Sequence, residues 1–231
     1  MNMQTFFSEI TALCRNEQFL HSVMEKYHYD PEEYPNLKRL AGEMIPCLET
    51  EAGWQDREIK ETFPGRDQSF LAVGITLGKG IDALQEKYLQ NGFLTESYMI
   101  EVLSSELLLK SYRAYTEWVV VHRNLHVARL HFLGGGEISE TSESQIGSLL
   151  RLANLPMLLQ ELALPVTCNT AYCMIPKKSV VFYAELTKDP FTKCAGICLG
   201  CGRRDCPNRP NRPLSYGYAR IFSKSTDENG R

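Results

Sequence analysis

Apolar residues recur every three or four positions over much of this chain, which is the periodicity of helices that pack on one side. The pattern predicts helices over residues 5–27, 36–51, 81–90, 95–122 and 144–164. The segment 95–122 is the longest and has the broadest apolar face, so we expect it to be the central helix of the core. In the segment 144–164 we expect a break at Pro156, because proline lacks the N–H that continues a helix.

Shorter apolar or alternating runs between these segments predict β-strands. The runs cover residues 54–62, 69–77, 127–133, 165–174, 179–186 and 216–222. We expect 165–174 and 179–186 to be antiparallel neighbours in one sheet. Residues 78–80 form a strand-to-helix turn. Residues 74–80 do not match a phosphate-binding loop, since the spacing between Gly74 and Gly78 is one residue short and Gly80 stands where Ser or Thr would bind magnesium.

The composition indicates the class of protein. With 231 residues, 43% hydrophobic and 23% charged, the chain is long enough for one domain or two small ones. Its net charge of −3 gives no general attraction to nucleic acids. No apolar run has the length that spans a bilayer, and residues 1–10 do not resemble a signal peptide. We therefore expect a cytoplasmic protein whose partners include neither a membrane nor a nucleic acid.

A cysteine cluster near the C-terminus is the clearest candidate for a metal site. Cys194, Cys198, Cys201 and Cys206 follow the spacing C-x3-C-x2-C-x4-C, and Pro207 comes next. Four thiols this close together cannot be independent core residues, so we interpret them as one ligand set. Thiolates in a tetrahedral site bind an iron–sulfur cluster or zinc, and tight spacing with a final Cys-Pro is closer to the iron–sulfur pattern. Zinc is the alternative, and a surface loop without metal is the third interpretation.

The other cysteines and the basic residues after the cluster have simpler interpretations. The cysteines in apolar segments are expected to pack in the core; they are Cys14, Cys47, Cys168 and Cys173. Arginines make the C-terminal segment locally positive; they are Arg203, Arg204, Arg209 and Arg212. This segment is either a solvated surface or a docking site for an acidic partner or for phosphate.

One segment carries a resemblance to a known family. The sequence Met174-x-Pro176-x-Lys178-Ser179-Val180, between two predicted strands, resembles a motif of the activation domain of cobalamin-dependent methionine synthase and of free-standing bacterial proteins related to it. Other pieces occur in the order that the free-standing proteins show; they are Thr76-Leu77-Gly78, the long helix from Thr95, and C-x2-C-x4-C at Cys198, Cys201 and Cys206. The resemblance covers residues 69–209.

That resemblance implies an α+β fold in which helices pack around a twisted antiparallel sheet, here with a C-terminal cysteine-rich metal-binding loop. It also implies reductive activation of a corrinoid (cobalamin-dependent) methyltransferase system. An electron from a low-potential donor and a methyl group from S-adenosylmethionine restore methylcobalamin on a corrinoid-carrying partner. Methyl transfer draws an unfavourable reduction forward, and the protein holds the methyl group in line with cobalt. The implied cofactors are S-adenosylmethionine, an iron–sulfur cluster or zinc, and cobalamin on the partner.

The same resemblance names cofactor-binding candidates. The motif supplies Met174, Pro176, Lys178 and Ser179. Arg129 and Gly135 are further candidates, because the family places R-x-x-x-G-Y after the long helix to bind the carboxylate of S-adenosylmethionine. The corresponding stretch of this chain, residues 129–136, has its glycine one position off that spacing and lacks the tyrosine. A family T-E-S triplet corresponds to Asn-Thr-Ala at 169–171, which lacks the acidic group.

We expect three regions along the chain. Residues 1–66 form an N-terminal helical and strand segment, 67–190 an activation-domain-like α+β core, and 191–231 the cysteine cluster and basic tail. Two functions are consistent with this organisation. One is the activation factor; the other is a non-catalytic, metal-stabilised protein-interaction module that keeps the fold and has lost the cofactor.

Overall fold

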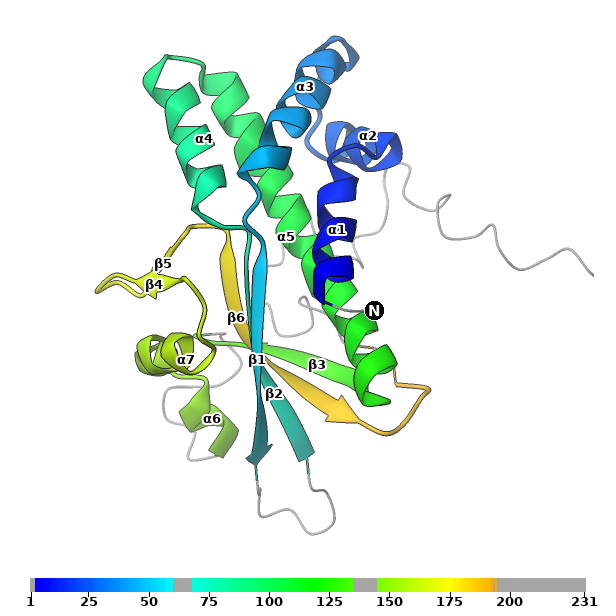
Figure 1. Cartoon of the computed structure of the whole chain (residues 1–231), viewed down its shortest axis with the longest axis vertical. Helices are drawn as coiled ribbons and strands as arrows, with labels where there is room; N and C mark the ends of the chain where they lie inside the picture. Colours follow the sequence, from blue (N-terminus) through cyan, green and yellow to red (C-terminus); the bar gives the residue numbers. More distant parts are fainter. Residues whose placement is uncertain (1–2, 60–67, 135–144, 193, 195–231) are drawn as a thin grey trace, which may run out of the picture.

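The computed structural model describes residues 3–59, 68–134, 145–192 and 194. Its centre is a four-stranded antiparallel sheet in the order β1-β2-β6-β3 (Figure 1). These strands are β1 Glu51–Ile59, β2 Gln68–Thr76, β3 His126–Phe132 and β6 Ser179–Thr187. A separate hairpin pairs β4 (Thr167–Cys168) with β5 (Met174–Ile175). The expected mixture of helices with an antiparallel sheet is confirmed, whereas the cysteine-rich loop and the strand at 216–222 lie outside the described residues.

Helices pack against both faces and one end of this sheet (Figure 1). They are α1 Met3–Leu13, α2 Glu17–Lys26, α3 Tyr34–Met44, α4 Lys79–Gln90, α5 Leu94–Arg123, α6 Gln145–Leu149 and α7 Leu155–Glu161. Short 3-10 turns occur at Pro31–Glu33, Ile45–Cys47 and Leu152–Asn154. Within the described ranges, no helix combines the length and the apolar character needed to cross a bilayer.

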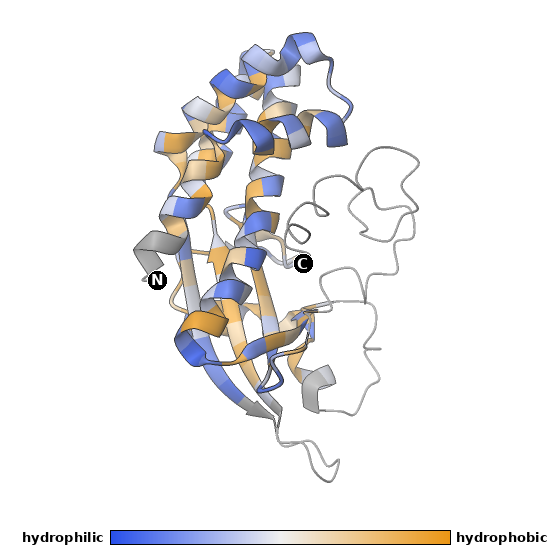
Figure 2. Ribbon diagram, turned by 90° about the vertical axis from the view of Figure 1, so that its right-hand side faces the viewer, coloured by the Kyte–Doolittle hydropathy of each residue, from blue (hydrophilic) through white to orange (hydrophobic). Residues whose placement is uncertain are grey.

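The long helix α5 joins two parts of the core. Its first half packs with α1 to α4 in an apolar cluster that includes Leu20, Leu40 and Leu103. Its second half lies against the sheet, where Tyr115 and Phe182 are fully buried. A third cluster covers the opposite face of the sheet with residues of α7 and its flanking segments. Figure 2 shows that hydrophobic residues are frequent along the strands of the sheet. Because both faces are covered, the central strand β6 is an almost continuous apolar run.

The predicted helix over residues 5–27 is two helices. α1 ends at Leu13, and Asn16 caps α2 because its Oδ1 accepts a hydrogen bond from the backbone N of Phe19 at 2.9 Å. Asparagine satisfies the free N–H groups at a helix start, and the apolar period does not reveal this break. The prediction over 36–51 is also too long, since α3 ends at Met44 and β1 already begins at Glu51.

The run 165–174 does not pair with β6 as predicted. β4 and β5 pair with each other, and β6 pairs with β2 and β3. The physical reason is a tight turn: Asn169 Oδ1 accepts hydrogen bonds from the backbone N of Ala171 at 2.9 Å and of Cys173 at 3.0 Å. The run therefore folds back on itself.

The break in the helical segment 144–164 comes earlier than Pro156. α6 ends at Leu149, and Pro156 is the second residue of α7. Proline is accepted there because N–H groups in the first helical turn have no partner within the helix.

Two opposed glycines let the segment after α7 pack directly on the sheet. Gly53 of β1 lies opposite Gly74 of β2. A Cβ at Gly53 would lie 2.3 Å from the carbonyl O of Leu162, and one at Gly74 would lie 2.3 Å from Cδ1 of Leu164. Since β1 pairs with β2 along its length, the region 1–66 contributes an edge strand to the same sheet as the region 67–190.

Candidate functional site

The motif turn, residues 176–178, joins β5 to β6 and contacts the turn that follows β2. Ser179 Oγ donates to the carbonyl O of Pro176 at 2.8 Å and lies 2.8 Å from Thr76 Oγ1. Thr76 Oγ1 also accepts a hydrogen bond from the backbone N of Gly78 at 3.1 Å. The Ile175–Pro176 peptide bond is cis. Residues 76–78 and 174–180, which the sequence singled out separately, are therefore in direct contact.

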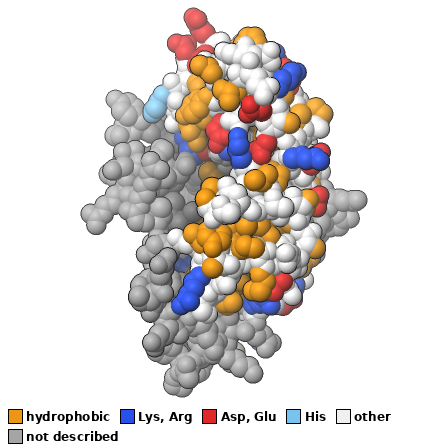
Figure 3. Space-filling model, turned by 90° about the vertical axis from the view of Figure 1, so that its left-hand side faces the viewer, with side chains coloured by type: hydrophobic (Ala, Val, Ile, Leu, Met, Phe, Trp, Pro, Cys, Tyr) orange, Lys and Arg blue, Asp and Glu red, His pale blue; other side chains and the backbone are white. Residues whose placement is uncertain are grey.

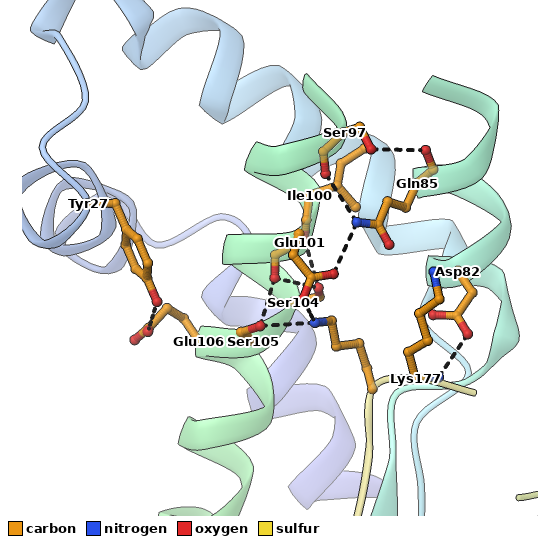
Figure 4. A network of polar contacts seen from close by, with 11 residues as sticks. Tyr27, Asp82, Gln85, Ser97, Ile100, Glu101, Ser104, Ser105, Glu106 and Lys177 are labelled. Atoms are coloured by element: carbon orange, nitrogen blue, oxygen red, sulfur yellow. Dashed lines mark hydrogen bonds and ion pairs between the residues drawn. The ribbon is translucent and has the colours of Figure 1, made fainter. Parts of the chain in front are cut away.

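Lys178 points away from Ser179, toward α5. Its side chain is only 9% exposed, and its Nζ forms an ion pair with the Glu101 carboxylate. The same Nζ donates to Ser105 Oγ at 3.0 Å, and Gln85 Nε2 of α4 donates to the Glu101 carboxylate at 3.0 Å (Figure 4). These contacts attach the motif turn to α5. Lys178 has partners inside the protein, and its role as a cofactor ligand stays a prediction.

The pair also affects the titration of Glu101. Burial raises the pKa of the Glu101 carboxyl, but the hydrogen bond and the positive charge of Lys178 outweigh burial, so the pKa lies below its ordinary value. A carboxyl whose pKa is lowered in the folded state stabilises the fold above its unfolded pKa. That contribution is lost as the pH falls through the folded pKa.

Replacing Glu101 with glutamine is expected to destabilise the protein by about 1–2 kcal/mol at neutral pH, because a nearly buried ammonium loses its counter-charge. The expected loss of stability is small because the Glu101 side chain is 38% exposed, so water screens its charge pair with Lys178. The difference in the free energy of unfolding between this variant and wild type should shrink as the pH falls below about 4. In that range the wild-type Glu101 carboxyl becomes protonated and is then neutral, as glutamine is. Urea unfolding at neutral and acidic pH measures both effects.

The control for that substitution is Glu117→Gln on the same helix. Glu117 pairs with Arg113 at 3.1 Å in an exposed ion pair, so its loss should cost no more than about 0.5 kcal/mol. Equal costs for the two variants at neutral pH would show that Glu101 does not attach the turn to α5.

Asp82, in the first turn of α4, contacts the motif turn from another side. Its Oδ2 accepts a hydrogen bond from the backbone N of Lys177 at 2.8 Å (Figure 4). Its Oδ1 is buried and has no hydrogen-bond partner among the described residues. The carboxylate thus fixes the backbone of the turn.

Met174 lies in the β4–β5 hairpin. It is opposite Cys168, and both pack against the apolar cluster on the α7 side of the sheet. Core packing is confirmed for Cys168, which is half-buried, and is wrong for Cys173, which is exposed in the hairpin. Figure 3 shows apolar side chains across the middle of this face of the molecule. Exposed apolar residues of α7 and the hairpin are Met157, Tyr172 and Ile175.

Arg129 lies on β3, opposite Glu185 of β6. Ser179 and Glu185 are separated by an even number of positions on β6, so both point to the face covered by α7. At the rise of an antiparallel strand, the two positions are roughly 20 Å apart. The structure therefore brings Arg129 and Ser179 to one face of the sheet at opposite ends of β6, whereas Lys178 lies on the other face.

A pair on this face was not predicted from the sequence. His131 Nε2 lies 3.0 Å from Glu185 Oε2, and the Phe70 ring centroid is 5.9 Å from that of His131. A signal for Glu185 existed, because it is the one charged residue within the apolar run 180–186. A carboxylate in such a strand needs a partner, since burying an unpaired charge is costly.

The cysteine cluster falls within the described part of the chain only at its first member. Cys194 is half-buried and packs against the apolar cluster between α5 and the sheet. Cys198, Cys201, Cys206 and Gly135 lie outside the described residues, so their roles stay predictions. Among the residues that are described, no three His, Cys, Asp or Glu side chains are grouped so that they could hold a metal ion.

No family model matches this chain, and a search of curated proteins finds no significant match. The function is therefore inferred from the residues of the site and from the sequence motifs.

Proposed function

We propose that this protein activates or maintains a corrinoid-dependent methyltransferase partner by reduction and methylation at cobalt. The supporting observation is the contact between residues 76–78 and the motif turn, with Arg129 on the sheet face to which Ser179 points. These are positions at which the sequence resembles the activation-domain family. The corrinoid of the partner protein would be the substrate. The reaction would take place in a reducing compartment such as the cytoplasm.

S-adenosylmethionine would bind beside Arg129 at the β3 edge of the sheet, because α7 buries Val181 and Tyr183 in the middle of β6 on this face. Arg129 would bind the carboxylate, because a guanidinium can donate two parallel hydrogen bonds to it. A second guanidinium lies in the same row of the sheet, where Arg57, Phe70, Glu185 and Arg129 are successive neighbours. The Arg57 guanidinium forms an ion pair with the Glu161 carboxylate of α7, and its Nε is buried without a hydrogen-bond partner among the described residues. When bound, S-adenosylmethionine would supply the methyl group.

The cysteine segment would hold an iron–sulfur cluster, with zinc as the alternative. Four thiolates suit either centre. Cys194 packs against the core, so the segment starts at a fixed place beside the sheet. An iron–sulfur cluster would supply the electron that it receives from a low-potential donor protein.

A non-catalytic, metal-stabilised interaction module is the second candidate. One observation favours it: the Ser179 hydroxyl and the Lys178 ammonium already have partners within the protein. The motif turn is therefore complete without a ligand, and the fold would persist after loss of the cofactor.

Calorimetry with S-adenosylmethionine under strict anaerobiosis distinguishes the two candidates. We expect wild-type protein to bind, and Arg129→Leu to bind about tenfold more weakly or worse, since the ligand carboxylate loses a charged hydrogen-bond donor. Arg113→Leu, an exposed arginine on α5, is the matched control and should bind as wild type does. If wild-type protein gives no heat of binding with S-adenosylmethionine at millimolar concentration, the methyl-transfer function is eliminated and the interaction module is the function that is left.

A further inference from the structure

The turn between α4 and α5 concentrates exposed apolar side chains. Eleven large apolar side chains are exposed in the described part of the chain, and four of these fall within residues 89–98. They are Leu89, Phe93, Leu94 and Tyr98, each between 47% and 66% exposed, and we call them the apolar tip. Figure 1 shows this turn at the ends of α4 and α5 that point away from the sheet.

The apolar tip has the composition of a protein-binding surface. Single exposed apolar residues are common, but a group of them surrounded by polar residues is typical of an interaction site. Leu94 and Tyr98 are four positions apart on α5, so they lie on one face of that helix. Phe93 comes directly before Leu94, and aromatic residues such as Phe93 and Tyr98 are enriched at protein interfaces.

Contacts with neighbouring segments hold the aromatic rings of the tip. The Phe93 ring centroid lies 6.0 Å from that of Tyr88, and the backbone N of Phe93 donates to the carbonyl O of Tyr88 at 3.0 Å. The Tyr88 hydroxyl in turn donates to the Glu43 carboxylate of α3 at 2.7 Å. The Tyr98 ring centroid lies 6.5 Å from that of Tyr29, in the connection between α2 and α3. Rings held in this way lose little freedom when a partner binds.

The surface around the apolar tip is acidic. Residues 28–36 and 86–98 together carry five carboxylates and one lysine. The two segments are adjacent, because Asn36 Nδ2 donates to Glu96 Oε1 at 3.4 Å. No ion pair among the described residues involves any of these carboxylates. We call them the acidic rim; they are Asp30, Glu32, Glu33, Glu86 and Glu96.

Basic side chains of α3, beside the tip, do not neutralise this rim. Lys38 and Arg39 are already paired with Glu17 and Glu43, respectively. An anionic lipid surface would be repelled by the rim, and so would the same rim of a second copy of this chain. A surface with Lys and Arg would be attracted, both by the carboxylates and by the faces of the exposed aromatic rings.

We propose that the apolar tip and its acidic rim dock a protein partner whose contact surface combines apolar side chains with Lys and Arg. Burial of the apolar side chains would drive association, and the opposite charges would select the partner and speed the encounter. The site requires neither the cysteine cluster nor S-adenosylmethionine, so it is independent of the proposed function.

The test is fluorescence anisotropy with a labelled synthetic amphipathic helix made of leucine and lysine, and with the same peptide in which glutamate replaces lysine. We expect wild-type protein to bind the lysine peptide at least about tenfold more tightly than the glutamate peptide. Phe93→Ser and Leu94→Ser remove apolar contacts, and Glu32→Lys and Glu86→Lys reverse charges of the rim. Each should weaken binding of the lysine peptide by about tenfold. Added salt should also weaken binding by wild-type protein.

Val121→Ser and Glu117→Lys are the matched controls. Val121 is an exposed apolar residue near the other end of α5, and Glu117 belongs to an exposed ion pair on the same helix. At the rise of an α-helix, Val121 lies roughly 40 Å from Leu94. Both variants should bind the lysine peptide as wild type does.

Several outcomes would overturn this docking site. They include equal binding of the two peptides, equal binding by the tip variants and wild type, and no binding of the lysine peptide at millimolar concentration. A wild-type dimer that Leu94→Ser dissociates in analytical ultracentrifugation would show that the tip joins two copies of this chain instead. Binding to phosphatidylserine vesicles that is lost in Leu94→Ser would assign the tip to a membrane. The proposed function would stand in each case, because binding of S-adenosylmethionine tests it separately.

Discussion

Replacing Cys201 with serine is expected to remove iron and acid-labile sulfide from protein purified under anaerobic conditions. Wild-type protein should contain both and should be coloured. Cys201 lies in the middle of the C-x3-C-x2-C-x4-C run, so its loss leaves three thiolates where a cluster needs four ligands. A serine hydroxyl ionises far less readily than a thiol and is a poor ligand for iron. Metal and sulfide analysis with the visible spectrum measures the effect.

Cys173→Ser is the matched control for this substitution. Cys173 is an exposed thiol in the β4–β5 hairpin and lies outside the predicted ligand set. Its replacement should leave the iron content, the sulfide content and the spectrum unchanged. Equal loss of iron in both variants would contradict the assigned ligand set. One equivalent of zinc in colourless wild-type protein would establish zinc as the bound metal. It would also rule out electron transfer through the cysteine site.

Truncating Phe182 to alanine is expected to lower the free energy of unfolding by about 3–5 kcal/mol, the usual cost of deleting a buried ring. Phe182 has 0% exposure on the central strand β6. Its ring centroid lies 5.8 Å from that of Tyr112, 6.0 Å from Tyr115 and 5.7 Å from Phe132. These rings belong to α5 and β3, so alanine would leave a cavity where helix and sheet meet. Urea unfolding monitored by circular dichroism measures the loss.

Phe191→Ala makes the same chemical change on the surface. Because Phe191 is almost fully exposed, we expect the free energy of unfolding to stay within about 0.5 kcal/mol of wild type. A similar cost at both positions would mean that the Phe182 ring does not lie in the core between α5 and the sheet.

The elements that were predicted well are those whose signal is local. α4, α5, β2 and β3 all begin and end within two residues of their predicted positions, because helical or strand periodicity depends on near neighbours. The errors arose where a polar side chain interrupts that pattern. Asn16 divides the first helix by capping α2, and Asn169 folds the run 165–174 into a hairpin.

The candidate site was predicted only in part, because only some of its features have a local signal in the sequence. The residues of the motif turn could be named from their order in the sequence, but their partners could not. Lys178 contacts Glu101, which precedes it by 77 residues, and Ser179 contacts Thr76, which precedes it by 103. Such contacts depend on which strands pair and in which register, and neighbouring residues do not specify this.

The sequence by itself determined the helical core around α5, the motif of residues 174–180 and the spacing of four thiols, because each is a short-range pattern of residue types. Only the tertiary structure decided that Ser179 and Arg129 share one face of the sheet while Lys178 is held on the other. It also decided that Cys194 packs against the apolar cluster between α5 and the sheet. The physical reason is that side chains alternate between the two faces of a strand, so strand register and helix packing set the neighbours of each side chain.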